Sequence, residues 1–213
     1  AASDVYKRQV LFCRVGVMDL KRVSVSDMDN NCYLLFCKGE GLLIDAADDA
    51  PRLLGLAAEC GVRITKVVTT HAHWDHVRAL GEVLAATGAV HYASALDAPE
   101  LPCGVDVKLS DGDVIEFCGV ELPVVVLRGH TAGGVCVVAE LGGVPNLFVG
   151  DSLFPGGLGK TGSVADFELL FSDVSSRLFD RFPDDAVVWP GHGASTTLGA
   201  ERGSLGSWWE RKW

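Results

Sequence analysis

Short apolar blocks separated by turn residues run along the chain, and this pattern predicts many strands and few helices. Near the start, blocks rich in Val, Leu and Ile lie at 10–17, 22–26, 32–37 and 41–46. Lys38-Gly39-Glu40-Gly41 forms a predicted hairpin turn between the last two blocks. Further blocks predict strands at 63–70, 89–94, near 105–109, and at 113–118, 120–128, 134–140, 146–150 and 186–190.

Three segments predict helices. Residues 50–60 carry Pro51 near the first turn and are followed by Gly61, which are helix boundary signals. Residues 76–88 form a second predicted helix that Gly88 closes. The third, 166–182, is amphipathic, because its apolar residues follow the 3.6-residue period. These residues are assigned to the core: Phe167, Leu170, Phe171, Val174, Leu178 and Phe182.

The strands come in antiparallel-looking runs with helices interspersed, which predicts an α+β fold. We expect two packed sheets with helices outside them, in a single domain that covers residues 10–213. Residues 1–9, AASDVYKRQ, resemble a translated sequencing-adapter remnant. We therefore expect this segment to be non-native or disordered, and it does not enter the fold prediction.

Composition and charge limit the kinds of partner that we expect the protein to bind. Acidic residues exceed basic ones, with a net charge of −10, and no Lys/Arg cluster offsets this, so a nucleic-acid partner is not expected. No apolar run reaches the length of a membrane span, and no signal peptide is evident. The cysteine number is odd and C-x-x-C pairs are absent, so we expect buried, reduced thiols in a cytoplasmic protein. The seven cysteines are at 13, 32, 37, 60, 103, 118 and 136.

The stretch TTHAHWDHV, residues 69–77, holds three of the six histidines directly after a predicted strand. On extended chain, side chains two residues apart share a face, so His71 and His73 can reach one metal ion. Asp75 and His76 are adjacent at the turn into the next helix and must point elsewhere. The motif therefore predicts two metal ions with two ligands each, and the remaining ligands must come from distant positions.

Three further residues could supply the remaining metal ligands. His130, Asp151 and His192 each follow an apolar strand and lie beside glycine, where a side chain can face a cleft. Unrelated histidines would not gather at strand ends in this way. His91 is different, because it lies inside a predicted strand without acidic neighbours, and we expect it to be structural.

Taken together, these motifs carry a family resemblance. T-H-x-H-x-D-H, followed by G-H-T, G-D-S-L-F and P-G-H-G, resembles the metallo-β-lactamase-fold hydrolases over residues 15–200. Within them it resembles the glyoxalase-II-like (hydroxyacylglutathione hydrolase-like) branch, in a short form that lacks the C-terminal helical domain. The resemblance implies a four-layer αββα sandwich with metals at one edge between the sheets.

The resemblance also implies a ligand set. His71, His73 and His130 would bind the first metal ion, and Asp75, His76 and His192 the second, with Asp151 bridging them. Zinc is the expected metal, with iron or manganese as alternatives. A bridging hydroxide formed on two such ions would attack a carbonyl. Asp151 and Asp75 are the expected catalytic carboxylates, and Asp75 is either a ligand alone or also a proton acceptor.

The sequence limits the classes of reaction that we expect the protein to catalyse. The main class of zinc β-lactamases has Cys where this chain has Asp151, which disfavours β-lactam hydrolysis. The short gap between Asp151 and His192 disfavours the nuclease branch. We expect hydrolysis of a small-molecule thioester, ester or lactone, with the thiol carrier left open. One alternative is a mononuclear iron persulfide dioxygenase that uses His71, His130 and Asp151, and another is a non-enzymatic metal-binding or scaffold protein.

Other residues are assigned secondary roles. Lys160 lies in a segment that lacks the first glycine of a phosphate-binding loop, so we expect either a substrate carboxylate or phosphate contact or a solvated lysine. Thr131 is a candidate hydrogen-bonding partner behind the metal ligands. Trp74 is expected to line the cleft or to pack under the helix. The Asn30–Asn31 pair is expected in a turn. The tryptophans near the end are expected to cover the core or form a dimer contact, in a monomer or a homodimer; they are Trp208, Trp209 and Trp213.

Overall fold

A computed structural model describes residues 18–212, and the first layer of the fold is a six-stranded sheet. Its strands lie in chain order: β1 (Asp19–Val25), β2 (Asn30–Cys37), β3 (Glu40–Ile44), β4 (Arg63–Thr69), β5 (Val90–Ser94) and β6 (Val107–Leu109). β1, β2 and β3 pair antiparallel, and β3 to β6 pair parallel. The parallel strands point their carboxyl ends to one edge of the sheet, where His71 follows β4.

The second sheet has the order β14-β13-β10-β9-β8-β7. Its strands are β7 (Val114–Phe117), β8 (Val120–Leu127), β9 (Gly134–Leu141), β10 (Val144–Gly150), β13 (Val187–Pro190) and β14 (Thr196–Thr197). β11 (Leu153–Phe154) and β12 (Gly157–Leu158) form a small separate hairpin. β10 and β13 are parallel, so the residues that follow them, Asp151 and His192, emerge at the same edge.

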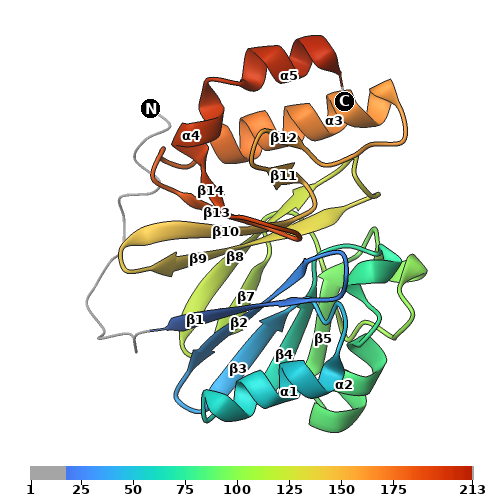
Figure 1. Cartoon of the computed structure of the whole chain (residues 1–213), viewed down its shortest axis with the longest axis vertical. Coiled ribbons are helices and arrows are strands. Elements are labelled where there is room, and N and C mark those ends of the chain that lie inside the picture. The colour runs from blue at the N-terminus through green and yellow to red at the C-terminus, as the bar shows by residue number, and fades with distance from the viewer. Residues whose placement is uncertain (1–17, 213) are drawn as a thin grey trace.

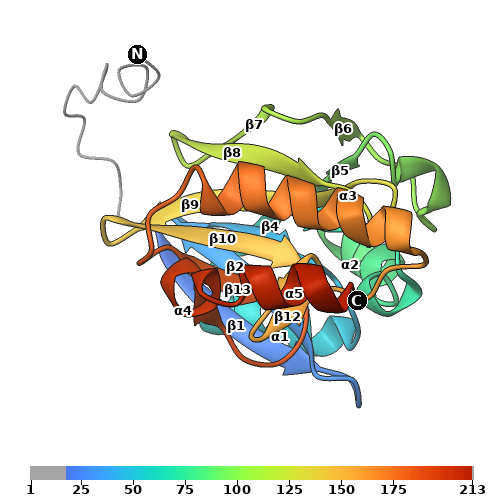
Figure 2. The ribbon, with the colours of Figure 1, turned by 90° about the horizontal axis from the view of Figure 1, so that it is seen from above.

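Helices cover the outer face of each sheet (Figure 1). α1 (Ala50–Glu59) and α2 (Leu80–Thr87) cover the first sheet, and the short turns η1 (Trp74–His76) and η2 (Ala98–Glu100) connect its strands. α3 (Val164–Val174), its π-helical extension η3 (Ser175–Phe179), α4 (Leu198–Arg202) and α5 (Leu205–Arg211) cover the second. Seen from above, α3 and α5 lie over the strands of that sheet (Figure 2).

Three apolar clusters hold these layers together, and β2 shows how. Successive side chains of a strand point to opposite faces, so Leu34 packs toward α1 and α2 while Leu35 packs between the sheets. The cluster between the sheets also contains Val124 and Phe148 from the second sheet. The αββα sandwich expected from the sequence is confirmed, and both sheets bury both faces. No helix in residues 18–212 is long and apolar enough to cross a membrane.

The element boundaries differ from the predictions in three places. The predicted helix 76–88 starts only at Leu80, because residues 74–76 form the separate turn η1. The predicted helix 166–182 is α3 followed by the π-helical η3. The sequence pattern predicted no helix after β13, but this segment holds the two helices α4 and α5. The predicted strand 10–17 and the predicted non-native segment 1–9 lie outside the described residues.

The cysteines give one correction. Cys37 and Cys118 form a disulfide with their Cα atoms 6.4 Å apart, so the expectation of reduced thiols is wrong for this pair. The bridge joins the end of β2 to the turn between β7 and β8, and therefore links the two sheets. The sequence pattern could not predict it because 81 residues separate the partners. Disulfides are typical of oxidising compartments. The cytoplasmic location expected from the sequence rested on reduced thiols, and these two cysteines do not support it. Free cysteines in residues 18–212 are Cys32, Cys60, Cys103 and Cys136.

Candidate metal centre

The candidate ligands gather at one edge of the sandwich. The motif after β4 supplies His71, His73, Asp75 and His76 from the first sheet, while the segments after β8, β10 and β13 supply His130, Asp151 and His192 from the second. Three groups of ligating atoms lie within 4.8 Å of one another: His71, His73 and His130; His71, His76 and Asp151; and Asp75, His76 and His192. The structure therefore brings together all seven residues predicted as metal ligands.

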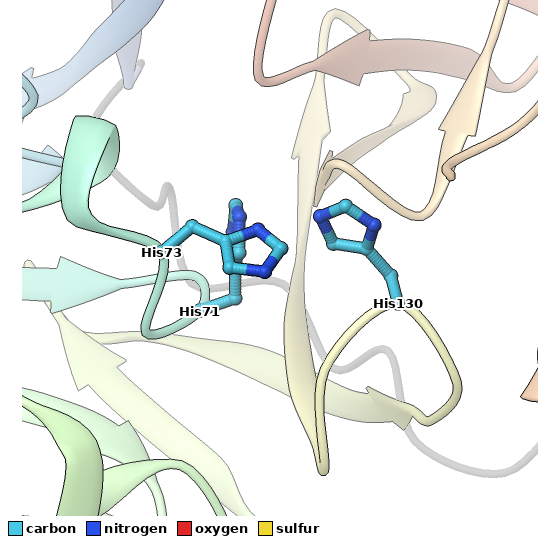
Figure 3. A group of neighbouring side chains, drawn as sticks. All are labelled: His71, His73 and His130. Atoms are coloured by element: carbon cyan, nitrogen blue, oxygen red, sulfur yellow. The ribbon is translucent and has the colours of Figure 1, made fainter. Parts of the chain in front are cut away.

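The first group consists of three imidazoles that face one another (Figure 3). The ring centroids of His73 and His130 are 4.5 Å apart, and those of His71 and His130 are 4.9 Å apart. The Nε2 atoms of His71 and His130 are buried, and neither has a hydrogen-bond partner among the described residues. Burying a ring nitrogen without a hydrogen-bond partner costs free energy unless another group binds its lone pair. These atoms fit a metal ion, which would supply that partner.

Asp151 lies between the two groups of ligands. Its Oδ2 is 3.7 Å from Nε2 of His130 and 3.4 Å from Nε2 of His192, and its Oδ1 is 3.4 Å from Nε2 of His76. Oδ1 is buried and has no hydrogen-bond partner among the described residues. The carboxylate is thus within reach of ligands from both groups, which is the position that a residue bridging two metal ions needs.

The electrostatics of the two groups differ. Burial lowers the pKa of His71 well below its ordinary value, and the neighbouring His76 ring lowers it further. Burial also lowers the pKa of His130. Both rings are therefore neutral at ordinary pH, which is the form that binds metal. These two rings can therefore bind a metal ion without losing a proton.

In the second group, the neighbouring carboxylates favour the protonated form of the histidines. Burial lowers the pKa of His76, but the nearby Asp151 and Asp45 carboxylates outweigh this and raise it to about 10. A hydrogen bond to Asp151 also raises the pKa of His192. For Asp151, burial raises the pKa, while the nearby His192 and His76 rings lower it far below its ordinary value. A metal ion in this group would displace these protons and replace their positive charge.

Neighbouring groups orient the histidine rings. Asp45 Oδ2 lies 2.8 Å from Nδ1 of His76, the Met28 carbonyl 2.8 Å from Nδ1 of His192, and the Lys160 carbonyl 2.7 Å from Nδ1 of His130. Each bond occupies one ring nitrogen and leaves Nε2 for a metal ion, as is usual for metal-binding histidines. Sequence reasoning missed all three partners. For Asp45 a signal existed, since it too is a carboxylate at the end of an apolar strand.

Glycine is required where the ligands approach the backbone. A Cβ on Gly191 would lie 2.1 Å from Asp151 Oδ1 and 2.6 Å from His76 Cε1. A Cβ on Gly159 would lie 1.7 Å from the Asp151 carbonyl oxygen. These distances are far below van der Waals contact, so any side chain there would displace the ligands. Gly191, which precedes His192 in the sequence, and Gly159 thus have a steric role at the centre.

The secondary assignments have mixed outcomes. The Lys160 side chain is exposed and lines a cavity of about 480 Å³ together with Leu158, Thr161, Gly162, Ser163 and Lys212. Trp74 is 62% exposed with Arg78 over its ring, so the expectation that it packs under the helix is wrong. Its role in lining the cleft stays a prediction. Thr131 Oγ1 is buried and has no hydrogen-bond partner among the described residues, so its predicted role also stays untested.

Three further expectations can be compared with the structure. His91 is fully buried and its ring nitrogens bond to Thr69 and to the Gly104 carbonyl, which confirms a structural role. Trp208 is buried in the core as expected, Trp209 is partly exposed, and Trp213 lies outside the described residues. The Asn30–Asn31 pair is not in a turn, because it starts β2 and is buried. The turn occupies the preceding residues, 26–29.

Comparisons with known proteins agree with this geometry. Residues 25–192 match the family model described as the metallo-beta-lactamase superfamily. A hydroxyacylglutathione hydrolase from Polaromonas is 37% identical over 163 residues, which are 75% of this chain and 60% of the relative. A metallo-beta-lactamase from Staphylococcus aureus superposes with a TM-score of 0.78 at 25% identity, over 92% of this chain and 66% of that one.

A second solved structure bears on the metal. TTHA1623, in a di-iron-bound form, superposes with a TM-score of 0.72 at 28% identity, covering 85% of this chain and 96% of that one. The described chain spans about 60% of the length of the first curated relatives that it matches.

Proposed function

Because the chain belongs to the metallo-beta-lactamase superfamily, we propose that this metal-dependent hydrolase uses a two-metal centre to cleave a small-molecule thioester or a related ester or lactone. The observation that carries the proposal is the convergence of seven ligating side chains on one edge of the sandwich. The buried, unpartnered atoms His71 Nε2, His130 Nε2 and Asp151 Oδ1 support it, because they need partners that a pair of cations would supply.

The residues divide into two ligand sets around a shared carboxylate. His71, His73 and His130 would hold the first ion, and Asp75, His76 and His192 the second, with Asp151 in contact with both. When bound, two such ions supply a water of lowered pKa and polarise the carbonyl that it attacks. Asp75 is 6% exposed and accepts a hydrogen bond from Asn30, which fixes its carboxylate at the centre, where it would be placed to take a proton from a metal-bound water.

The proposed substrate class rests on the relatives and on one cavity. The curated relatives are named hydroxyacylglutathione hydrolases, and a thioester formed on the sulfur of glutathione keeps the free carboxylates of its thiol carrier. Lys160 and Lys212 line the same cavity, and the Lys160 backbone contacts the ligand His130. We propose that Lys160 binds a carboxylate of the thiol carrier. Lys160→Ala should then raise KM for an anionic thioester and leave KM for a neutral ester unchanged.

The metal we propose is zinc, at two ions per chain. A solved relative carries two irons, so metal analysis of the protein purified without a chelating tag is the first measurement. Two zinc ions per chain support the hydrolase. One iron per chain would support a mononuclear dioxygenase centred on His71, His130 and Asp151, and oxygen uptake with a persulfide would test it.

Turnover of a thioester panel that includes S-lactoylglutathione tests the activity. His73→Ala and Asp151→Ala should each abolish hydrolysis. Their circular dichroism spectra should match that of the wild-type protein. Asp185→Ala, an exposed carboxylate outside the centre, is the matched control and should retain full activity. Undiminished turnover in either of the first two variants would show that the centre is not the site of hydrolysis.

A further inference from the structure

The turn between β1 and β2, residues 26–29, lies against the second group of ligands. His192 Nδ1 is 2.8 Å from the carbonyl oxygen of Met28 and donates to it. This bond leaves Nε2 of the ring facing Asp75, whose Oδ2 is 3.2 Å away. The backbone of Asn30, directly after the turn, forms an isolated antiparallel bridge with His192. The turn is therefore fixed to the segment that carries this ligand.

Asn30 connects the turn to a second ligand. Its side chain is fully buried, and Nδ2 donates to Asp75 Oδ2 over 2.9 Å. The same oxygen lies 3.6 Å from Nε2 of His76, so it is the oxygen that faces the other ligands of this group. A carboxylate oxygen can accept more than one bond, so Oδ2 can accept from Asn30 and still bind a metal ion. The bond fixes the rotation of the Asp75 carboxylate without adding a charge.

Ser26 determines which way the Asn30 amide points. Ser26 Oγ lies 2.6 Å from Asn30 Oδ1 and donates to it, while it accepts the Met28 N–H over 3.0 Å. Because the hydroxyl donates to the amide oxygen, the amide nitrogen is the atom that faces Asp75. Ser26 has a φ of 66°, a left-handed conformation that few non-glycine residues adopt. These hydrogen bonds within the turn offset the cost of that conformation.

The first group of ligands has no such connection to this turn. His71 Nδ1 contacts the hydroxyl of Thr70, and His130 Nδ1 contacts the Lys160 carbonyl. Both partners lie on other segments of the chain. A change in the turn should therefore reach two ligands of the second metal ion and leave those of the first ion in place.

We propose that the turn at 26–29 and the adjoining Asn30 form a positioning device that sets the affinity of the second metal site alone. Asn30 is its main positioning residue, and Ser26 orients it. The proposal rests on the two-metal centre of the proposed function. Loss of a hydrogen-bonding partner behind a metal ligand costs roughly 10–100-fold in metal affinity. Removing the Asn30 amide should weaken binding of the second metal ion by about this factor.

The test is a titration of the metal-depleted full chain with cobalt(II), followed by visible absorption and by metal analysis. In Asn30→Ala, the first equivalent should bind with its wild-type affinity and spectrum, while the second binds roughly 10–100-fold more weakly. Ser26→Ala should weaken the second equivalent by a smaller factor. The controls are Asn146→Ala, another buried asparagine whose side chain bonds to Val144 and Trp189, and Ser24→Ala on the exposed face of β1.

The outcomes separate this inference from the function on which it rests. A wild-type chain that binds a single cobalt ion would refute the two-metal proposal and this inference with it. Two ions bound by wild type, with the second affinity unchanged in Asn30→Ala, would refute only the role of the turn. So would an equal loss at both sites, or the same loss in Asn146→Ala, since either indicates general destabilisation. If Asn30→Ala does not fold, Ser26→Ala decides, and an unchanged second affinity there refutes the role.

Discussion

Asp45→Asn probes how the centre depends on a residue that binds no metal itself. Asp45 is 2% exposed and accepts three hydrogen bonds: from the Thr70 N–H and the Thr70 hydroxyl, both over 2.7 Å, and from His76 Nδ1 over 2.8 Å. Its φ is 60°, and asparagine tolerates this conformation well. The substitution therefore changes the hydrogen bonding and the charge while keeping the shape and the backbone.

The magnitude follows from the acceptors that are lost. The asparagine side chain has one oxygen, so the NH2 group must face at least one of the buried donors that Asp45 now accepts from. A buried donor without an acceptor costs about 1–3 kcal/mol. For a chain of this size that corresponds to a fall in Tm of about 2–12 °C. His76 also loses its orienting carboxylate, so the affinity of the second metal ion should fall roughly 10–100-fold.

Two measurements check the prediction: urea unfolding of the metal-free protein, and a cobalt(II) titration of the folded one. Asp173→Asn is the matched control, because Asp173 is a carboxylate of 3% exposure whose partners, Arg128 and Arg177, lie outside the centre. The control should lower stability and keep both metal affinities. An Asp45→Asn protein that binds the second ion as tightly as wild type would refute the argument that Asp45 orients His76.

Three further predictions follow from the same contacts. Gly191→Ala should abolish binding of two metal ions because its Cβ would overlap Asp151 Oδ1, whereas Gly203→Ala, with open space around it, should bind both; metal analysis distinguishes them. Reducing the Cys37–Cys118 disulfide opens a loop of 81 residues and should lower the free energy of unfolding by about 4–5 kcal/mol in the chain-entropy model. Unfolding curves with and without dithiothreitol measure this, and identical curves would contradict it. Finally, the raised pKa of His76 stabilises the metal-free protein fully below pH 6.5, its ordinary pKa, and this stabilisation should be lost as pH rises to about 10. In His76→Gln, Tm should therefore fall less than in the wild type as pH rises from 6.5 to about 10.

Sequence reasoning identified the candidate ligands that the fold brings together because two independent signals coincide at them. Histidine and aspartate are rare at the ends of apolar strands, and His71, His130 and Asp151 all occupy such ends. Strand ends can be read from local periodicity, and the edge at which parallel strands end is a property of the fold class. The layers of the sandwich were predictable for the same reason, since the blocks of apolar residues are local features.

What could not be predicted depends on contacts between distant segments. The partner of Asn30 is 45 residues away along the chain, and that of Cys37 is 81 residues away. The late start of α2 has a related cause. Residues 75 and 76 have helix-compatible sequence, but Asp75 and His76 must turn into the centre, and the tight turn η1 places them there. The helices α4 and α5 are too short for a periodic pattern to stand out.

The division of the ligands between the two sheets bears on when the centre can form during synthesis. The ribosome releases His71 first and His192 roughly 120 residues later. At about 5–20 residues per second, that interval is roughly 6–24 s. During it, the nascent chain exposes a histidine-rich segment without the partners that shape its preference for a metal. A complete set of donors, and with it any discrimination between metal ions, would therefore exist only once both sheets have folded together.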